Sequence, residues 1–119
     1  MVRFRLLIVI AALAALTLTA LSEAAAPPKL VGLVGPGFTI TMKRFNKPLK
    51  TLKAGRYTIT VSDKSSIHNF RIKGPGLNKE ITTVGFVGTK SVIVTLKKGR
   101  YTFVCDPHFT SMKGTITVS

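Results

Sequence analysis

Apolar and polar residues alternate with a period of two through most of the chain after residue 28. This is the period of a β-strand with one buried face, whereas an amphipathic helix repeats every 3.6 residues. Turn signals rich in glycine and proline, such as 35–37 and 74–76, separate the alternating runs at short, fairly regular intervals. The sequence therefore predicts an all-β sandwich of about seven or eight strands.

Side chains two residues apart in a strand face the same side, so the alternation also predicts which residues point inward. His68 is in phase with apolar residues of its strand, and so are Cys105 and, if its strand extends that far, Met112. We expect strands over 30–34, 38–42, 56–61, 67–73, 91–96, 100–105 and 114–118, a further candidate at 81–86, and a loop over 44–49.

The first 24 residues follow the plan of a secretory signal peptide. Arg3 and Arg5 precede an apolar run over 6–21, and small residues cluster over 22–26. We expect cleavage after residue 24, which leaves one folded domain over 25–119, exported to the periplasm, the cell envelope or the extracellular space. The alternative is an uncleaved anchor, although this run is short for a span of roughly 20 residues. No second apolar run is long enough to cross a membrane.

The charge is strongly positive, because residues 25–119 contain 16 basic and 3 acidic side chains, a formal charge of +13. Such a protein is attracted to anionic surfaces. Nucleic acid is not an expected partner, since an exported protein seldom meets it and the basic residues are spread along the chain. A solvated basic shell suited to acidic surroundings is the simpler interpretation.

Cysteine occurs once, at Cys105, and the stretch that it opens also contains His108 and Met112. The only other histidine is His68. Two imidazoles and a thiolate, with a distant methionine sulfur, are the donors of a blue copper site. Zinc would prefer a fourth strong ligand, while iron–sulfur clusters and covalently attached haem need further cysteines.

Each donor has a simpler explanation when taken alone. Cys105 would be a small buried hydrophobe, Met112 core filler, and each histidine a structural or exposed side chain. Together they use both histidines and the only cysteine of the chain, in phase with the core. The sequence therefore predicts one copper ion, Cu(I) or Cu(II), bound by these four side chains.

The segments Ile67–Phe70 and Tyr101–Gly114 resemble the two metal-binding segments of cupredoxins, most closely the plastocyanin, pseudoazurin and amicyanin branch. The resemblance implies a Greek-key β-sandwich with copper near one end. It implies three equatorial ligands and one axial ligand, Met112. It also implies that Asn69 ties the two ligand loops together and donates its backbone N–H to the thiolate sulfur.

The loop around the ligands has features of its own. Three residues separate His108 from Met112, where plastocyanins and pseudoazurins have four and amicyanins two, which leaves the axial Cu–Met distance and the potential open. Pro107 has no N–H to donate to the Cys105 sulfur, and fewer such bonds shift the redox potential. By resemblance His108 is the electron exit, and Pro107, His108 and Phe109 form an apolar docking patch, with 35–37 nearby and basic charge around it.

These features predict a monomeric, non-enzymatic one-electron carrier between redox partners. A partner with an acidic rim would be steered by the basic charge. Two alternatives are a copper carrier or buffer of the envelope that uses the same site, and a metal-free sandwich that binds an anionic partner. The sequence lacks the methionine- or histidine-rich extensions that would favour copper carriage.

Overall fold

The computed structural model describes residues 14–17 and 25–119, and the predicted signal peptide lies largely outside the described residues. Within this described part, no helix is long and apolar enough to cross a bilayer. The strands are β1 (Lys29–Val34), β2 (Ile40–Arg44), β3 (Lys47–Pro48), β4 (Thr51–Leu52), β5 (Gly55–Asp63), β6 (Phe70–Gly74), β7 (Leu77–Thr82), β8 (Gly88–Leu96), β9 (Gly99–Val104) and β10 (Lys113–Val118).

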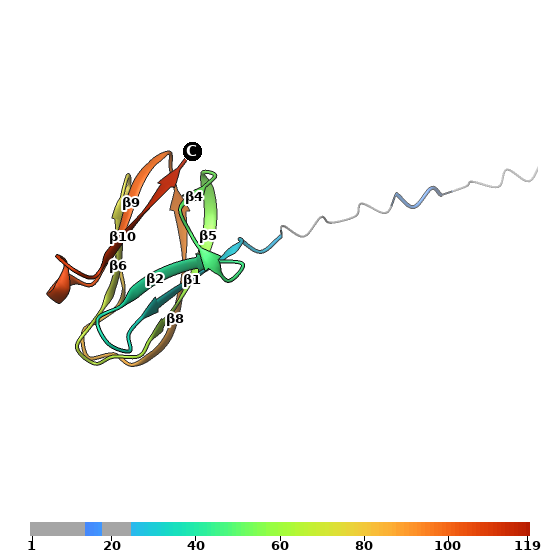
Figure 1. The fold of residues 1–119 in the computed structure, drawn as a ribbon. Helices are drawn as coiled ribbons and strands as arrows, with labels where there is room; N and C mark the ends of the chain where they lie inside the picture. Colours follow the sequence, from blue (N-terminus) through green and yellow to red (C-terminus); the bar gives the residue numbers. More distant parts are fainter. Residues whose placement is uncertain (1–13, 18–24) are drawn as a thin grey trace, which may run out of the picture.

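The strands form two five-stranded sheets that pack as a sandwich (Figure 1). One sheet has the order β3-β2-β1-β5-β8 and the other the order β4-β10-β9-β6-β7. Most neighbours are antiparallel, but β1 pairs with β5, and β4 with β10, in parallel. The predicted all-β sandwich is confirmed: eight strands have five or more residues, and β3 and β4 have two each.

The core follows directly from the alternation in sequence. In β5 every second side chain is buried, from Tyr57 through Ile59 and Val61, while the threonines between them are only partly buried. The opposite sheet supplies Phe70 and Phe103, whose rings stack with centroids 6.0 Å apart. Burial of these apolar faces is the main favourable term for folding, because each large side chain contributes about 1.5–3 kcal/mol.

Several strand boundaries differ from the sequence prediction. The strand expected over 67–73 begins only at Phe70, so His68 lies in the preceding loop, although it is buried as its phase indicated. The candidate strand at 81–86 has the wrong bounds, because the observed strand is Leu77–Thr82. The strand expected over 38–42 begins at Ile40, and Phe38, which precedes it, is 62% exposed. The loop predicted over 44–49 contains the short strand β3.

All the loops that follow β1, β5, β7 and β9 leave the same end of the sandwich. The pairing requires this, because β1 runs parallel to β5, and β9 antiparallel to both β10 and β6. We call this the site end, formed by residues 35–39, 64–69, 83–87 and 105–112. The opposite end is formed by the β8–β9 turn, the β6–β7 turn and the segment from β3 to the start of β5.

Candidate metal centre

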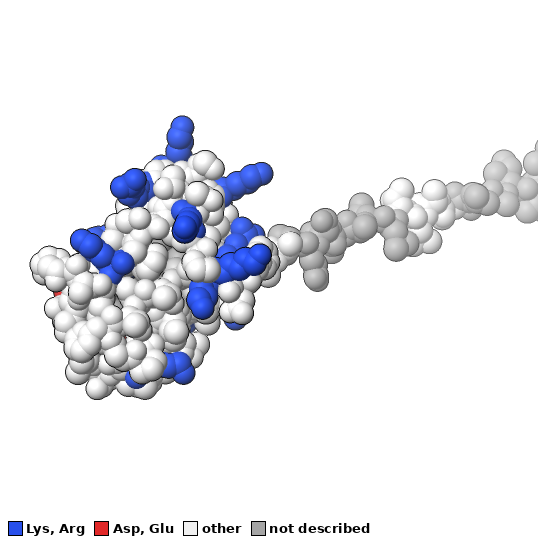
Figure 2. Space-filling view, in the orientation of Figure 1, with Lys and Arg blue, Asp and Glu red and all other residues white. Residues whose placement is uncertain are grey.

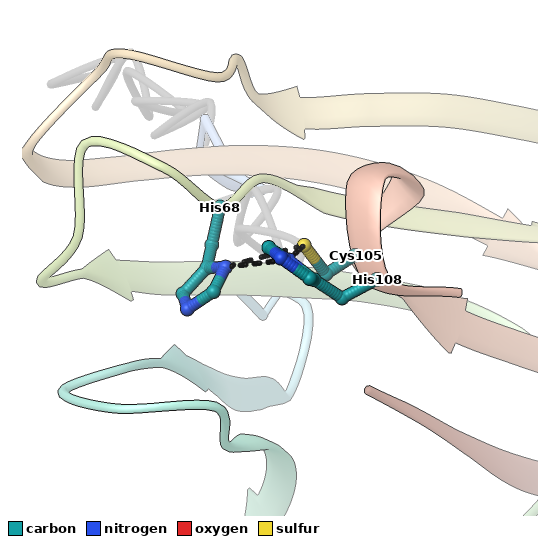
Figure 3. Close-up of side chains that lie close together, drawn as sticks. All are labelled: His68, Cys105 and His108. Carbon is teal, nitrogen blue, oxygen red and sulfur yellow. Dashed lines mark hydrogen bonds between the residues drawn. The ribbon is translucent and has the colours of Figure 1, made fainter. Parts of the chain in front are cut away.

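Two loops of the site end bring the three strong donors together (Figure 3). Cys105 directly follows β9 and is fully buried, and His68 lies two residues before β6 and is 1% exposed. His108 ends a short 3₁₀ turn, η1 (Asp106–His108), and is half-buried. Donors far apart in sequence therefore meet at one point because β6 and β9 are paired neighbours.

The ring orientation of His68 is fixed by a hydrogen bond to the β1–β2 loop. Its Nε2 lies 2.8 Å from the carbonyl oxygen of Gly37 and donates to it. In a neutral imidazole this leaves a lone pair on Nδ1, the atom that faces the other donors. The expectation that 35–37 lies beside the site is thus matched by a direct contact with a ligand ring.

The donor atoms are spaced as the ligands of one metal ion. Nδ1 of His68 lies 3.0 Å from Nδ1 of His108, and each nitrogen lies 3.6 Å from Sγ of Cys105. With metal–nitrogen bonds of about 2.0 Å and metal–sulfur bonds of about 2.3 Å, donors in a trigonal plane are separated by roughly 3.5–3.7 Å. The two nitrogen–sulfur distances match this spacing, and the nitrogen–nitrogen distance is shorter. Two imidazoles and one thiolate in this arrangement fit copper.

Met112 closes the ligand loop through its backbone. Its N–H donates to the carbonyl of His108 at 2.8 Å, and its carbonyl accepts the N–H of Cys105 at 3.0 Å. The side chain is buried, at 1% exposure, in the same core cluster as Cys105. The three-residue gap before Met112 is therefore accommodated by a compact turn with both ends hydrogen-bonded.

A polar network anchors the ligand loop on its outer side. The Asn69 side-chain oxygen accepts the backbone N–H of Asp106 at 2.7 Å, and its amide donates to the Asp106 carboxylate, also at 2.7 Å. Arg71 donates from Nε to both carboxylate oxygens and also binds Asn78 and Glu80. Burial acts to raise the pKa of Asp106, but these hydrogen bonds and the charge of Arg71 outweigh it and lower that pKa.

Phe38 covers the histidine rings on the solvent side. Its ring meets both in edge-on contact, with centroids 5.2 Å from His68 and 4.9 Å from His108. Sequence reasoning missed this residue, since its place in an alternating run indicated the core. It also missed Arg71, whose position on the polar face of β6 carried no signal of its tie to the ligand loop.

The surface around the donors is mainly apolar. Among the large hydrophobic side chains that are exposed, five lie in loops of the site end: Phe38, Ile67, Val84, Val87 and Phe109. Pro107 is exposed beside them. The ring of basic charge expected around this patch is sparse, because only Lys64, Arg71, Lys90 and Lys113 lie near this end by strand position, and Arg71 is paired with Asp106 and Glu80.

The family model for the cupredoxin-like domain matches residues 7–118, nearly the whole chain. The chain is a member of the cupredoxin family. Its cofactor is accordingly copper, and His68, Cys105 and His108 form the type 1 site of this cupredoxin. No curated protein sequence matched the chain.

Solved structures share the fold of this cupredoxin. A crystal structure of a rusticyanin variant is 24% identical over 81% of this chain and 80% of its own, with a TM-score of 0.58. Reduced rusticyanin gives the same identity and TM-score over 82% of each chain. Auracyanin A, a "blue" copper protein from the photosynthetic bacterium Chloroflexus aurantiacus, is 19% identical over 79% of this chain and all of its own, with a TM-score of 0.56.

Proposed function

We propose that this protein is an exported one-electron carrier that works through a single type 1 copper site. The observation that carries the proposal is the convergence of two imidazole Nδ1 atoms and one buried thiol, 3.0–3.6 Å apart, at one end of a cupredoxin sandwich. Bound copper would supply the Cu(I)/Cu(II) couple. The proposed role is electron transfer without catalysis on a substrate, as predicted from the sequence.

The surrounding residues are suited to holding the donors still while the charge at the site changes. His68 is fixed by Gly37, and the ligand loop by the side chain of Asn69 and by its own backbone hydrogen bonds. Donors that need not move contribute little reorganisation when an electron arrives or leaves. Pre-positioned ligands of this kind are a general requirement for precise metal sites.

Met112 and Pro107 are proposed to tune the site. The buried thioether of Met112 lies one turn beyond His108 and would serve as a weak axial ligand. Axial ligand identity and hydrogen bonding at the thiolate set the potential of such sites. Pro107 contributes no N–H near the sulfur. The predicted bond from the backbone N–H of Asn69 to the thiolate would be one of the few remaining ones.

Electrons are proposed to pass through His108, which is the half-buried ligand. The patch of Pro107, His108 and Phe109, enlarged by Phe38, offers an apolar surface of the kind that partner proteins dock against. We propose a redox protein as the partner and a monomer as the working state. An acidic rim on that partner would gain little from the sparse basic charge at this end. Export is supported by the signal-like sequence of residues 1–24.

The test is to add Cu(II) to the exported, metal-free protein and record visible and EPR spectra. We expect an intense thiolate-to-copper band, bleached by one electron equivalent of reductant and restored by one of oxidant. Cys105→Ser should lose the band, whereas Met112→Leu should keep it and shift the potential. Ser111→Ala, an exposed change in the same loop, serves as the control.

Two results would contradict the proposal. One is the absence of an intense visible band at stoichiometric copper, and the other is a band that survives in Cys105→Ser. A site that passes its copper to an acceptor protein faster than it exchanges electrons would instead indicate copper carriage.

A further inference from the structure

The basic side chains are unevenly distributed over the molecule. Figure 2 shows them projecting mainly from the part that contains β4, the start of β5 and the C-terminus, whereas the region near η1 and the lower loops carries few. Six exposed basic residues lie in two segments at the end opposite the copper site: Lys47, Lys50, Lys53, Lys97, Lys98 and Arg100. We call these six residues the basic end.

The two segments lie side by side. Gly55, two residues after Lys53, is paired with Leu96, which precedes Lys97 and Lys98. On the other side β10 separates β4 from β9, and Thr117 of β10 pairs with Thr51 and also with Arg100. The six positive charges therefore occupy one continuous surface at this end of the sandwich.

No acidic side chain compensates this charge. The three acidic residues of 25–119 are Asp63, Glu80 and Asp106. Asp63 ends β5 and Asp106 begins the ligand loop, both at the site end, and Glu80 lies in β7 and is paired with Arg71. Six cationic side chains without an acidic side chain among them repel one another, and a multivalent anion relieves that repulsion.

The surface also contains a hollow that suits a phosphate group. A cavity of about 470 Å³ is lined by Arg44, Lys53, Tyr57, Ser119 and the short strand β4. Arg44 is half-buried, and its guanidinium lies over the ring of Tyr57, which also lines the cavity. A guanidinium and a lysine ammonium that line one cavity are a good receptor for a phosphodiester oxygen.

We propose that the basic end binds the anionic phospholipid headgroups of a membrane surface. Binding there would orient the molecule with its apolar copper end away from the bilayer, toward other proteins. The cavity at Arg44 would hold one headgroup phosphate, while the surrounding lysines act through the surface potential. The basic end would then attach the protein to the membrane, and the site end would exchange electrons.

The experiment measures co-sedimentation of the exported protein, with and without copper, with vesicles of phosphatidylcholine and phosphatidylglycerol at 3:1. Each basic residue near an anionic bilayer contributes about a fivefold gain in affinity. We therefore expect Lys50→Gln combined with Lys53→Gln and Lys97→Gln to weaken binding by about 100-fold. The matched control is Lys64→Gln with Lys79→Gln and Lys90→Gln, which removes the same charge elsewhere and should weaken binding less than about tenfold.

Two further measurements distinguish a lipid headgroup from free phosphate and test whether the copper end of the bound protein faces away from the bilayer. Inorganic phosphate at millimolar concentration should not displace the protein, whereas 0.5 M NaCl should. Reduction of the copper-loaded protein by hydroquinone, a neutral reductant, should proceed equally fast on and off the vesicles.

The proposal would be overturned by an equal loss of vesicle affinity in the two triple variants. It would also be overturned by binding to pure phosphatidylcholine as tight as binding to the mixed vesicles, or by complete displacement by free phosphate. A failed copper site would be recognised separately, since it removes the visible band but leaves vesicle binding of the copper-free protein unchanged.

Discussion

At the scale of single residues, Phe38 shields two ligand rings from water although it is itself 62% exposed. A hydrophobic cover lowers the local dielectric and so disfavours the more highly charged, oxidised state of a metal site. We predict that Phe38→Ala lowers the reduction potential by about 30–60 mV, equivalent to roughly a three- to tenfold change in the redox equilibrium. Protein-film voltammetry of the copper-loaded protein measures this shift.

Phe45→Ala is the matched control for that prediction. Phe45 is also a large exposed aromatic residue, at 83% exposure, but it follows β2 at the opposite end and packs on Arg44. Its removal should leave the potential unchanged. If both variants shift the potential equally, or Phe38→Ala raises it, the shielding role assigned to Phe38 is wrong.

The donor residues were easier to predict from sequence than their neighbours. His68 and Cys105 belong to residue types that occur once or twice in the chain, and their phase with the core indicated that they point inward. Phe38 follows the same alternation, yet 35–37 forms a turn and β2 begins only at Ile40. Alternation alone does not determine where a strand starts. An exposed residue just before a strand, such as Phe38, is therefore assigned to the strand when its phase matches the buried positions.

At the scale of elements, Arg71 connects the ligand loop to two strands. It lies on β6 opposite Glu80 of β7 and Val104 of β9, and its guanidinium binds Glu80 at 2.8 Å and Asp106 at 2.9 Å. These contacts could not be predicted from sequence, because they depend on the register of three strands. The register also explains why Asp106, directly after the cysteine, is held in place.

We predict that Arg71→Met lowers the free energy of unfolding by about 1–2 kcal/mol, since partly exposed ion pairs and charged hydrogen bonds contribute little individually. The looser loop should also lose copper faster to a chelator. Urea denaturation and the decay of the visible band measure the two effects. Lys79→Met removes the same charge from an exposed site on β7 and is the control. Equal behaviour of the two variants would mean that net charge, not the tie to Asp106, is responsible.

At the scale of the whole molecule, the sandwich was predicted from the alternation of apolar and polar residues, and the net charge from composition. The location of the basic end opposite the copper site was not predicted. Basic residues are spread from Lys29 to Lys113 in the sequence. Six of them gather in space because the turns that carry them, around Lys53 and Lys97, leave the sandwich at the end away from Cys105. Only the pairing of the strands determines which turns share an end.

The copper site also connects the two sheets. Gly37, which holds His68, follows β1 of one sheet, whereas Cys105 follows β9 of the other. Because the chain has a single cysteine, it cannot join these loops by an internal disulfide. A metal ion bound by both loops is therefore the strongest link between them. A ligand that binds only the folded state stabilises it by about 2.7 kcal/mol at a hundred times its dissociation constant.

We therefore predict that copper raises the melting temperature by about 10–20 °C, because 1 kcal/mol corresponds to roughly 4–8 °C in a domain of this size. Differential scanning calorimetry with and without one equivalent of Cu(I), under anaerobic conditions, measures the shift. Cys105→Ser should retain only a small part of it, because the two histidines remain but lie on loops that the thiolate no longer joins. A full shift in Cys105→Ser would mean that copper stabilises the fold from elsewhere. An unchanged melting temperature in the copper-loaded protein would mean that the loops are held by Asn69 and Arg71 alone.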